Sequence, residues 1–192
     1  MSRILSVLLL TALPLLARAP ECHLFEKIPA QLEGPRLVEY LSATEGHTNA
    51  CVQYAILRLG ALKYVGAIDV LVTYLDFTQP LPPFPQAVVS NGGDRPFPAA
   101  TALMEIGKPA LPALLKVAGK AGTSEMARKH AIDRVMGIFN NDAGGIAAFM
   151  KASRAAADPD VAARLAAAAK EAFRFCAPTE KPACAAILSE HP

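Results

Sequence analysis

Apolar residues recur along the chain with the three- and four-residue spacing of one face of an α-helix. Seven stripes of this kind begin, in chain order, at Val52, Ile68, Ala99, Leu111, Ile132, Ile146 and Leu165. The stripes before Leu165 fall into successive pairs. Within each pair the second stripe starts 12 to 16 residues after the first, which leaves room only for a short turn between the two helices. The pattern therefore predicts a series of helical hairpins and an all-α fold.

The first stripes of the hairpins recur at a regular interval. The steps from Ala99 to Ile132 and from Ile132 to Leu165 are 33 residues each, whereas the step from Val52 to Ala99 is 47. A period in the thirties built from helix pairs is typical of an α-solenoid. The 14 extra residues fall within Thr78–Pro98, where six prolines predict an extended loop, because proline at this density cannot continue a helix. Two interpretations stay open for this loop: a binding segment and a tolerated insertion.

Short helices are expected at both ends of the series. Residues 35–42 form one candidate, with Thr48 or Asn49 as the cap of the helix that follows. Residues 183–190 form the other, after a break between Pro178 and Pro182. Such end helices would shield the apolar faces that stacked repeats otherwise leave open.

The segment Leu103–Leu115, which reads LMEIGKPALPALL, closely resembles the core of bacterial HEAT-like repeats. In that family an apolar-Gly step ends the first helix, and a Pro-x-Leu-Leu helix packs back after a short turn. Residues 59–75 and 140–150 look like weaker copies, and the resemblance covers about residues 48–175. It implies a short α-solenoid of about three to four HEAT-like hairpins with capping helices. It also implies a tendency to bind proteins or other macromolecules, and it implies no reaction.

The first twenty residues have the layout of a secretory signal peptide. Arg3 precedes the apolar run Ile4–Leu16, and Ala17-Arg18-Ala19 supplies a cleavage pattern of small residues. The run is shorter than the ~20 residues that a membrane-spanning helix needs. We therefore expect residues 1–20 to be removed and residues 21–192 to form a single domain. The mature protein would be periplasmic or secreted, with no membrane span.

The chain has four cysteines, an even number that suggests disulfides in an exported protein. Cys176 and Cys184 flank the turn before the last helix, so a bridge between them would hold that helix in place. Cys22 and Cys51 would then pair by elimination. A zinc site is an alternative. His47 and Cys51 are four residues apart and could face the same way on a helix, and Cys22 and His23, which are neighbours in the sequence, could complete four ligands. The weaker of the two expectations is zinc, and no metal ligand is assigned.

Charge argues against a general nucleic-acid binder. Removal of the leader takes away Arg3 and Arg18 and leaves 17 basic and 17 acidic residues, whereas nucleic-acid binding needs a basic excess. The balance is uneven, however, with 5 basic and 9 acidic residues in 20–107 and 11 basic and 6 acidic residues in 108–175. The second half is therefore the better candidate to meet an anionic partner.

Four cations in the second half could form a binding surface. Lys116 and Lys151 occupy the same position in consecutive second helices, and Lys120 and Arg154 follow one turn later. Stacked repeats would bring them together as a basic ladder for a protein or an anionic polymer, and an ordinary solvated face is the alternative. His130 and His191 have no partner nearby in the sequence and are expected at the surface.

No nucleophile motif or phosphate-binding glycine loop is present, and no catalytic residue or cofactor is assigned. Gly144-Gly145 could offer free N–H groups to an anion, although a tight turn between two helices better explains the two consecutive glycines. We expect a monomeric, non-catalytic exported protein that acts as a protein-interaction scaffold or adaptor. The alternative is a ligand-binding protein or enzyme that uses Thr78–Pro98 as a lid.

Overall fold

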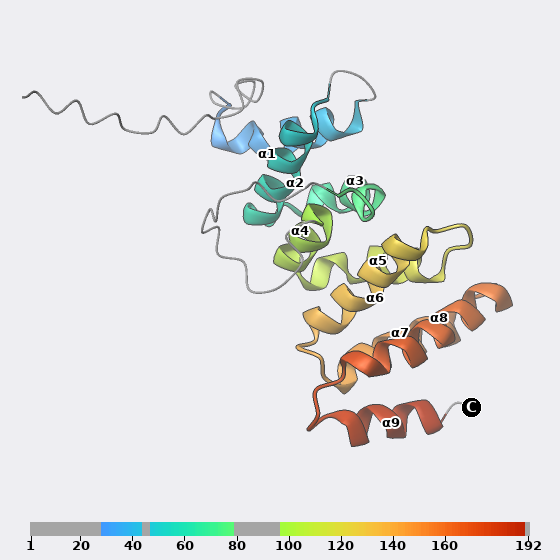
Figure 1. Ribbon diagram of the computed structural model, residues 1–192. Coiled ribbons are helices and arrows are strands. Elements are labelled where there is room, and N and C mark those ends of the chain that lie inside the picture. The colour runs from blue at the N-terminus through green and yellow to red at the C-terminus, as the bar shows by residue number, and fades with distance from the viewer. Residues whose placement is uncertain (1–27, 44–46, 79–96, 191–192) are drawn as a thin grey trace, which may run out of the picture.

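The computed structural model describes residues 28–43, 47–78 and 97–190, and all regular structure in these ranges is helical (Figure 1). This confirms the all-α prediction. The α-helices, in chain order, are α1 (Ala30–Ser42), α2 (Asn49–Ala61), α3 (Ile68–Leu71), α4 (Pro98–Ile106), α5 (Leu111–Gly119), α6 (Glu125–Ile138), α7 (Ala143–Ala155), α8 (Pro159–Ala172) and α9 (Lys181–Ser189). Short 3-10 helices adjoin several of them, namely η2 (Val65–Ala67), η3 (Val72–Tyr74), η4 (Lys108–Ala110) and η5 (Phe173–Phe175).

The helices follow one another in chain order from α1 at one end of the molecule to α9 at the other (Figure 1). The first helices of the predicted hairpins are neighbours, because α2 packs against α4, α4 against α6, and α6 against α8. The closest packing between helices adjacent in sequence joins α5 to α6 and α7 to α8. The predicted hairpins correspond to α4 with α5 and to α6 with α7, so the observed pairs are shifted by one helix along the chain.

The predicted apolar stripes form the core. In α2, Val52, Ala55, Ile56 and Leu59 are all at most 4% exposed. Buried apolar residues from each of α1 to α9 belong to one continuous cluster that runs the length of the described chain. Since full burial of a leucine or isoleucine side chain contributes ~1.5–3 kcal/mol, this shared core holds the helices together.

Small residues let the helices approach closely where α2 crosses α4. Gly60 of α2 lies directly against Ala102 of α4, and a Cβ on Gly60 would fall only 2.6 Å from the Cα of Ala102. Both residues are buried. The contact is between one helix backbone and the other, so neither side can move away by a rotamer change alone.

Three elements differ from the prediction. Helix α1 begins at Ala30, so Pro35 lies inside it and not at its start. The terminal helix begins at Lys181 and ends at Ser189, with Pro182 in its first turn. The stripe from Ile68 to Leu75 is not one helix: it is divided between α3 and η3, and η2 comes directly before it. Residues 65–73 contain five β-branched residues, which have restricted χ1 angles and lower helix propensity, and this accounts for the interruption.

Side-chain caps fix the start of several helices. Thr48 accepts a hydrogen bond from the backbone N–H of Cys51 at 3.4 Å, which confirms Thr48 as one of the two predicted caps of α2. Asp158 accepts from the N–H of Asp160 at 2.8 Å at the start of α8. Each cap satisfies an N–H that the first turn of a helix leaves without an intrahelical partner.

Polar contacts connect helices that are distant in sequence. Glu33 of α1 accepts two hydrogen bonds from the guanidinium of Arg58 of α2, at 2.6 and 3.0 Å. These bonds lower the pKa of the Glu33 carboxyl below its ordinary value. The hydroxyl of Tyr74 donates to the carbonyl oxygen of Leu41 at 2.8 Å, and burial raises the pKa of this phenol.

Candidate binding groove

A groove of about 690 Å³ lies between residues 65–72, which run from η2 into η3, and residues 109–120, which run from η4 through α5. The residues that line it are Val65, Ile68, Asp69, Val72, Pro109, Pro112, Ala113, Lys116, Val117 and Lys120. On both walls they recur at spacings of three and four, so each wall is one face of a helical segment. The groove combines apolar surface with three charged side chains.

The orientation of the α5 wall follows from its amphipathic sequence. Leu114 and Ala118 point into the core and are fully buried. Lys116 and Lys120 are four residues apart on another face of the segment, where both are exposed and line the groove. The apolar stripe that the sequence places inward therefore determines which side chains reach the groove.

The end of α5, and with it Lys120, is fixed by contacts with α8. Gly119 lies so close to α8 that a Cβ would be 3.0 Å from Leu165 and 3.1 Å from Val161. Arg164 of α8 donates a hydrogen bond to the carbonyl oxygen of Gly119 at 2.7 Å. This bond satisfies a carbonyl that the end of the helix leaves free, and it holds the chain at the point where Lys120 leaves the helix.

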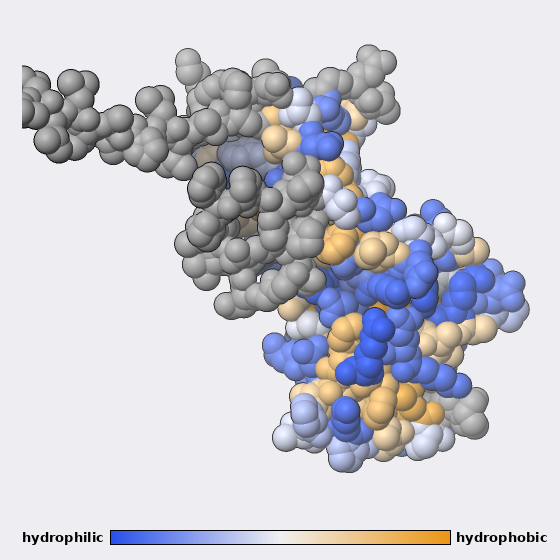
Figure 2. All heavy atoms as spheres, in the orientation of Figure 1, coloured by the Kyte–Doolittle hydropathy of each residue, from blue (hydrophilic) through white to orange (hydrophobic). Residues whose placement is uncertain are grey.

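The side-chain ammonium groups of Lys116 and Lys120 form no ion pair or hydrogen bond with another residue of the described chain. Several arginines behave differently, since Arg58 pairs with Glu33 and Arg128 with Glu171 at 2.7 Å. Figure 2 shows hydrophilic residues gathered over the middle of the molecule, with apolar residues beside them. The two lysine ammonium groups are therefore available to an anionic group that enters the groove.

Two of the four cations of the predicted basic ladder line the groove, and the ladder as a whole stays a prediction. Lys116 and Lys120 share the groove, whereas Lys151 and Arg154 lie on α7 and do not line it. Helix α5 packs mainly against α6 and α8, and α7 mainly against α8 and α9, so α5 and α7 make little direct contact. Sequence reasoning missed the opposite wall, although Val65, Ile68, Asp69 and Val72 follow the same helical spacing.

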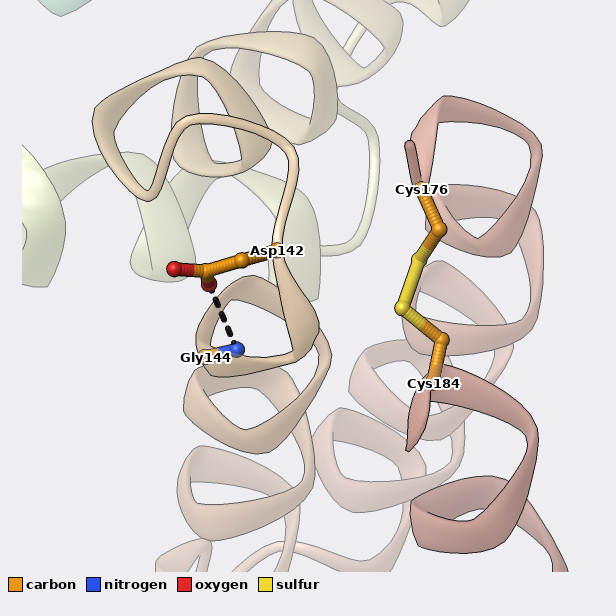
Figure 3. Close-up of a disulfide and its surroundings, with 4 residues drawn as sticks. All are labelled: Asp142, Gly144, Cys176 and Cys184. Carbon is orange, nitrogen blue, oxygen red and sulfur yellow. Dashed lines mark hydrogen bonds between the residues drawn. A yellow bond between two sulfur atoms is a disulfide. The ribbon is translucent and has the colours of Figure 1, made fainter. Parts of the chain in front are cut away.

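The disulfide between Cys176 and Cys184 is present, as predicted (Figure 3). Both cysteines are buried, and the bridge joins the chain after α8 to α9, which packs against α7. Cys51 is also buried and is not a free thiol. Cys22 lies outside the described residues, so the pairing of Cys22 with Cys51 stays a prediction.

The prediction that His130 lies at the surface is wrong. His130, expected at the surface, is buried at 8% exposure, and its ring lies 4.0 Å from that of Phe97. Helix α6 turns this residue toward the core, and one sequence cannot reveal that a histidine has an aromatic neighbour from a distant segment. The ring of His47 lies 4.3 Å from that of Tyr40. In the described ranges no three His, Cys, Asp or Glu side chains gather as a metal site, and the candidate ligands Cys22 and His23 fall outside these ranges.

The N–H groups at Gly144-Gly145 are engaged within the chain. Gly144 donates to the Asp142 carboxylate at 2.7 Å (Figure 3). Gly145 donates to the Asp142 carbonyl oxygen at 3.2 Å. Asp142 thus caps α7, which agrees with the interpretation of this segment as a turn. The proposed leader 1–20 and most of the proposed lid, residues 79–96, lie outside the described residues, as does His191.

None of the helices in the described ranges is long and apolar enough to cross a membrane. Comparisons with protein-family models, with curated proteins and with solved structures found no match to this chain.

Proposed function

We propose that this chain is a non-catalytic, exported protein of HEAT-like repeats that acts as a protein-interaction scaffold or adaptor. The observation that carries the proposal is the groove between the second helices of two neighbouring hairpins, with Lys116 and Lys120 on its rim and without partners in the described chain. In solenoid proteins the surface formed by successive repeats is the usual binding surface.

Local geometry supports the repeat assignment. The segment Leu103–Leu115, which resembles HEAT-like repeats, contains the end of α4, a turn and the start of α5. Gly107 ends α4 with a φ of 78°, a conformation that glycine adopts without the steric penalty of a Cβ. The serial contacts of α2, α4, α6 and α8 fit stacked hairpins.

The disulfide supports export. Cys176 and Cys184 are bonded, and structural disulfides persist in oxidising compartments such as the periplasm or the extracellular space. The sequence layout of residues 1–20 points to the same compartment. We infer that the protein meets its partner outside the cytoplasm.

The proposal is tested by affinity capture from a periplasmic extract with the mature protein as bait. A Lys116→Glu, Lys120→Glu double variant should lose captured partners, because two ammonium groups of the groove become carboxylates. The matched control is Lys151→Glu with Lys170→Glu, which changes the same charge on exposed positions of α7 and α8. Equal capture by the groove variant and the wild type would exclude the groove as the scaffold's binding surface. Loss with both variants would favour the basic ladder or a general charge effect.

A further inference from the structure

We infer that the groove binds an extended acidic peptide segment of the partner, in which apolar side chains separate the carboxylates. This inference rests on the proposed scaffold function and adds the chemistry of the bound segment. It follows from the two kinds of surface that the groove combines, cationic and apolar, and from the acidic residue on the wall opposite the lysines.

The cationic part selects carboxylates. Lys116 and Lys120 lie one helical turn apart along the same wall, and neither is neutralised by another described residue. Pro109 and Pro112, on the same wall, have no backbone N–H. The hydrogen-bond donors of this wall are therefore chiefly its lysine side chains, and an ammonium group binds an oxyanion with a charge-assisted hydrogen bond.

The apolar part distinguishes a peptide from a purely polar anionic polymer. Val65, Val72 and Val117 line the groove together with the two prolines, and Val65 is 53% exposed. A valine or leucine side chain of a peptide would cover this surface and gain from its removal from water, at ~25 cal/mol per Å². A sulfated or carboxylated polysaccharide offers little apolar surface to bury there.

Asp69 adds a second criterion. It lies on the wall opposite the lysines and is exposed, and its carboxylate forms no ion pair or hydrogen bond with another described residue. Its carboxylate repels a uniform polyanion but can accept a hydrogen bond from a peptide N–H. A chain with carboxylates on one side and backbone N–H groups on the other therefore fits both walls.

Fluorescence polarisation with labelled nine-residue peptides tests this inference on the mature, disulfide-bonded protein. The first peptide set is built from Glu, Val, Leu and Pro. A second set replaces Glu with Gln and removes the charge, and a third replaces Val and Leu with Ser and removes the apolar surface. We expect the first set to bind, and each replacement to raise Kd by about tenfold or more, the equivalent of about 1.4 kcal/mol.

Variants then locate the site. Lys116→Gln with Lys120→Gln should raise Kd for the first set by about tenfold, and binding should weaken as salt is added. The control Lys170→Gln with Lys181→Gln should leave Kd within about twofold, because these exposed lysines lie outside the groove and outside the predicted basic ladder. Circular dichroism of both variants checks that the helices are intact.

Several results would overturn the inference. Equal binding of the Ser set, or displacement of the peptides by dextran sulfate with no dependence on the groove lysines, would point to an anionic polymer. Binding of lauric acid in preference to the peptides would point to a lipid ligand. If no peptide binds while periplasmic capture still depends on the groove lysines, the peptide inference fails and the scaffold proposal stands. If capture also fails to depend on the groove lysines, the groove is not the binding site and both proposals fail.

Discussion

The crossing of α2 and α4 provides a sharp test of the fold, through the single substitution Gly60→Ala. Gly60 is buried, and an added Cβ would meet the Cα of Ala102 at 2.6 Å and its Cβ at 2.9 Å. Both contacts are shorter than real Cβ atoms show, and one is with helix backbone. The two helices would therefore have to separate, which disturbs the packing of Leu59 and Leu103 beside the contact.

The magnitude combines two opposing effects. Forcing an extra methyl group into a well-packed helix crossing costs ~1–3 kcal/mol. Replacing glycine with alanine inside a helix returns ~0.5–1 kcal/mol, because alanine loses less backbone entropy on folding. Backbone contact makes relaxation difficult here, so we expect Gly60→Ala to lower the free energy of unfolding by about 1–2 kcal/mol.

Urea denaturation followed by circular dichroism at 222 nm measures this change. Gly137→Ala in α6 is the matched control, since its Cβ would meet only the flexible side chain of Met104, with the Cε at 2.7 Å and the Sδ at 3.1 Å. That variant should be neutral or slightly stabilising, because Met104 can rotate away while helix propensity improves. If Gly60→Ala proves as stable as Gly137→Ala, the close approach of α2 and α4 is not present in solution.

Two further predictions concern the disulfide and one ion pair. Replacing both Cys176 and Cys184 with Ser should destabilise the protein by about 2.5 kcal/mol, because the unfolded chain regains the loop entropy that a bridge with a sequence separation of 8 removes. Thermal unfolding measures this change, and an unchanged melting temperature would contradict a structural role for the bridge. The hydrogen bond from Arg58 lowers the pKa of Glu33, so its stabilisation is complete above the ordinary value of 4.5 and is lost as the pH falls through the lowered value. An NMR titration should show the Glu33 pKa rising toward 4.5 in Arg58→Ala, and an unchanged pKa would exclude this contact.

Much of the fold could be predicted because helical periodicity records burial directly. The stripes that begin at Val52, Ala99, Ile132 and Leu165 all lie in α-helices and contribute buried residues to one core. Local chemistry was equally informative at Gly107, where a positive φ ends a helix. Each of these features depends on residues within one or two turns, so one sequence is enough to reveal it.

The arrangement of the helices was harder to predict, because it depends on side chains that meet from distant segments. Spacing alone paired each first helix with the next second helix, whereas the closest sequential packing joins α5 to α6 and α7 to α8. The groove is a further example. Lys116 and Lys120 could be selected from one helix, but Asp69 could not be placed opposite them without the fold.

The geometry of α5 separates folding from binding within one short helix. Its inward residues, Leu114 and Ala118, are fully buried, and substitutions there would damage the core. Lys116 and Lys120 are exposed, and their ammonium groups form no ion pair or hydrogen bond with the described chain, so removing their charge should cost little stability. Loss of binding without loss of stability in the lysine variants would therefore be a functional effect, because the two ammonium groups form no bond that the fold needs.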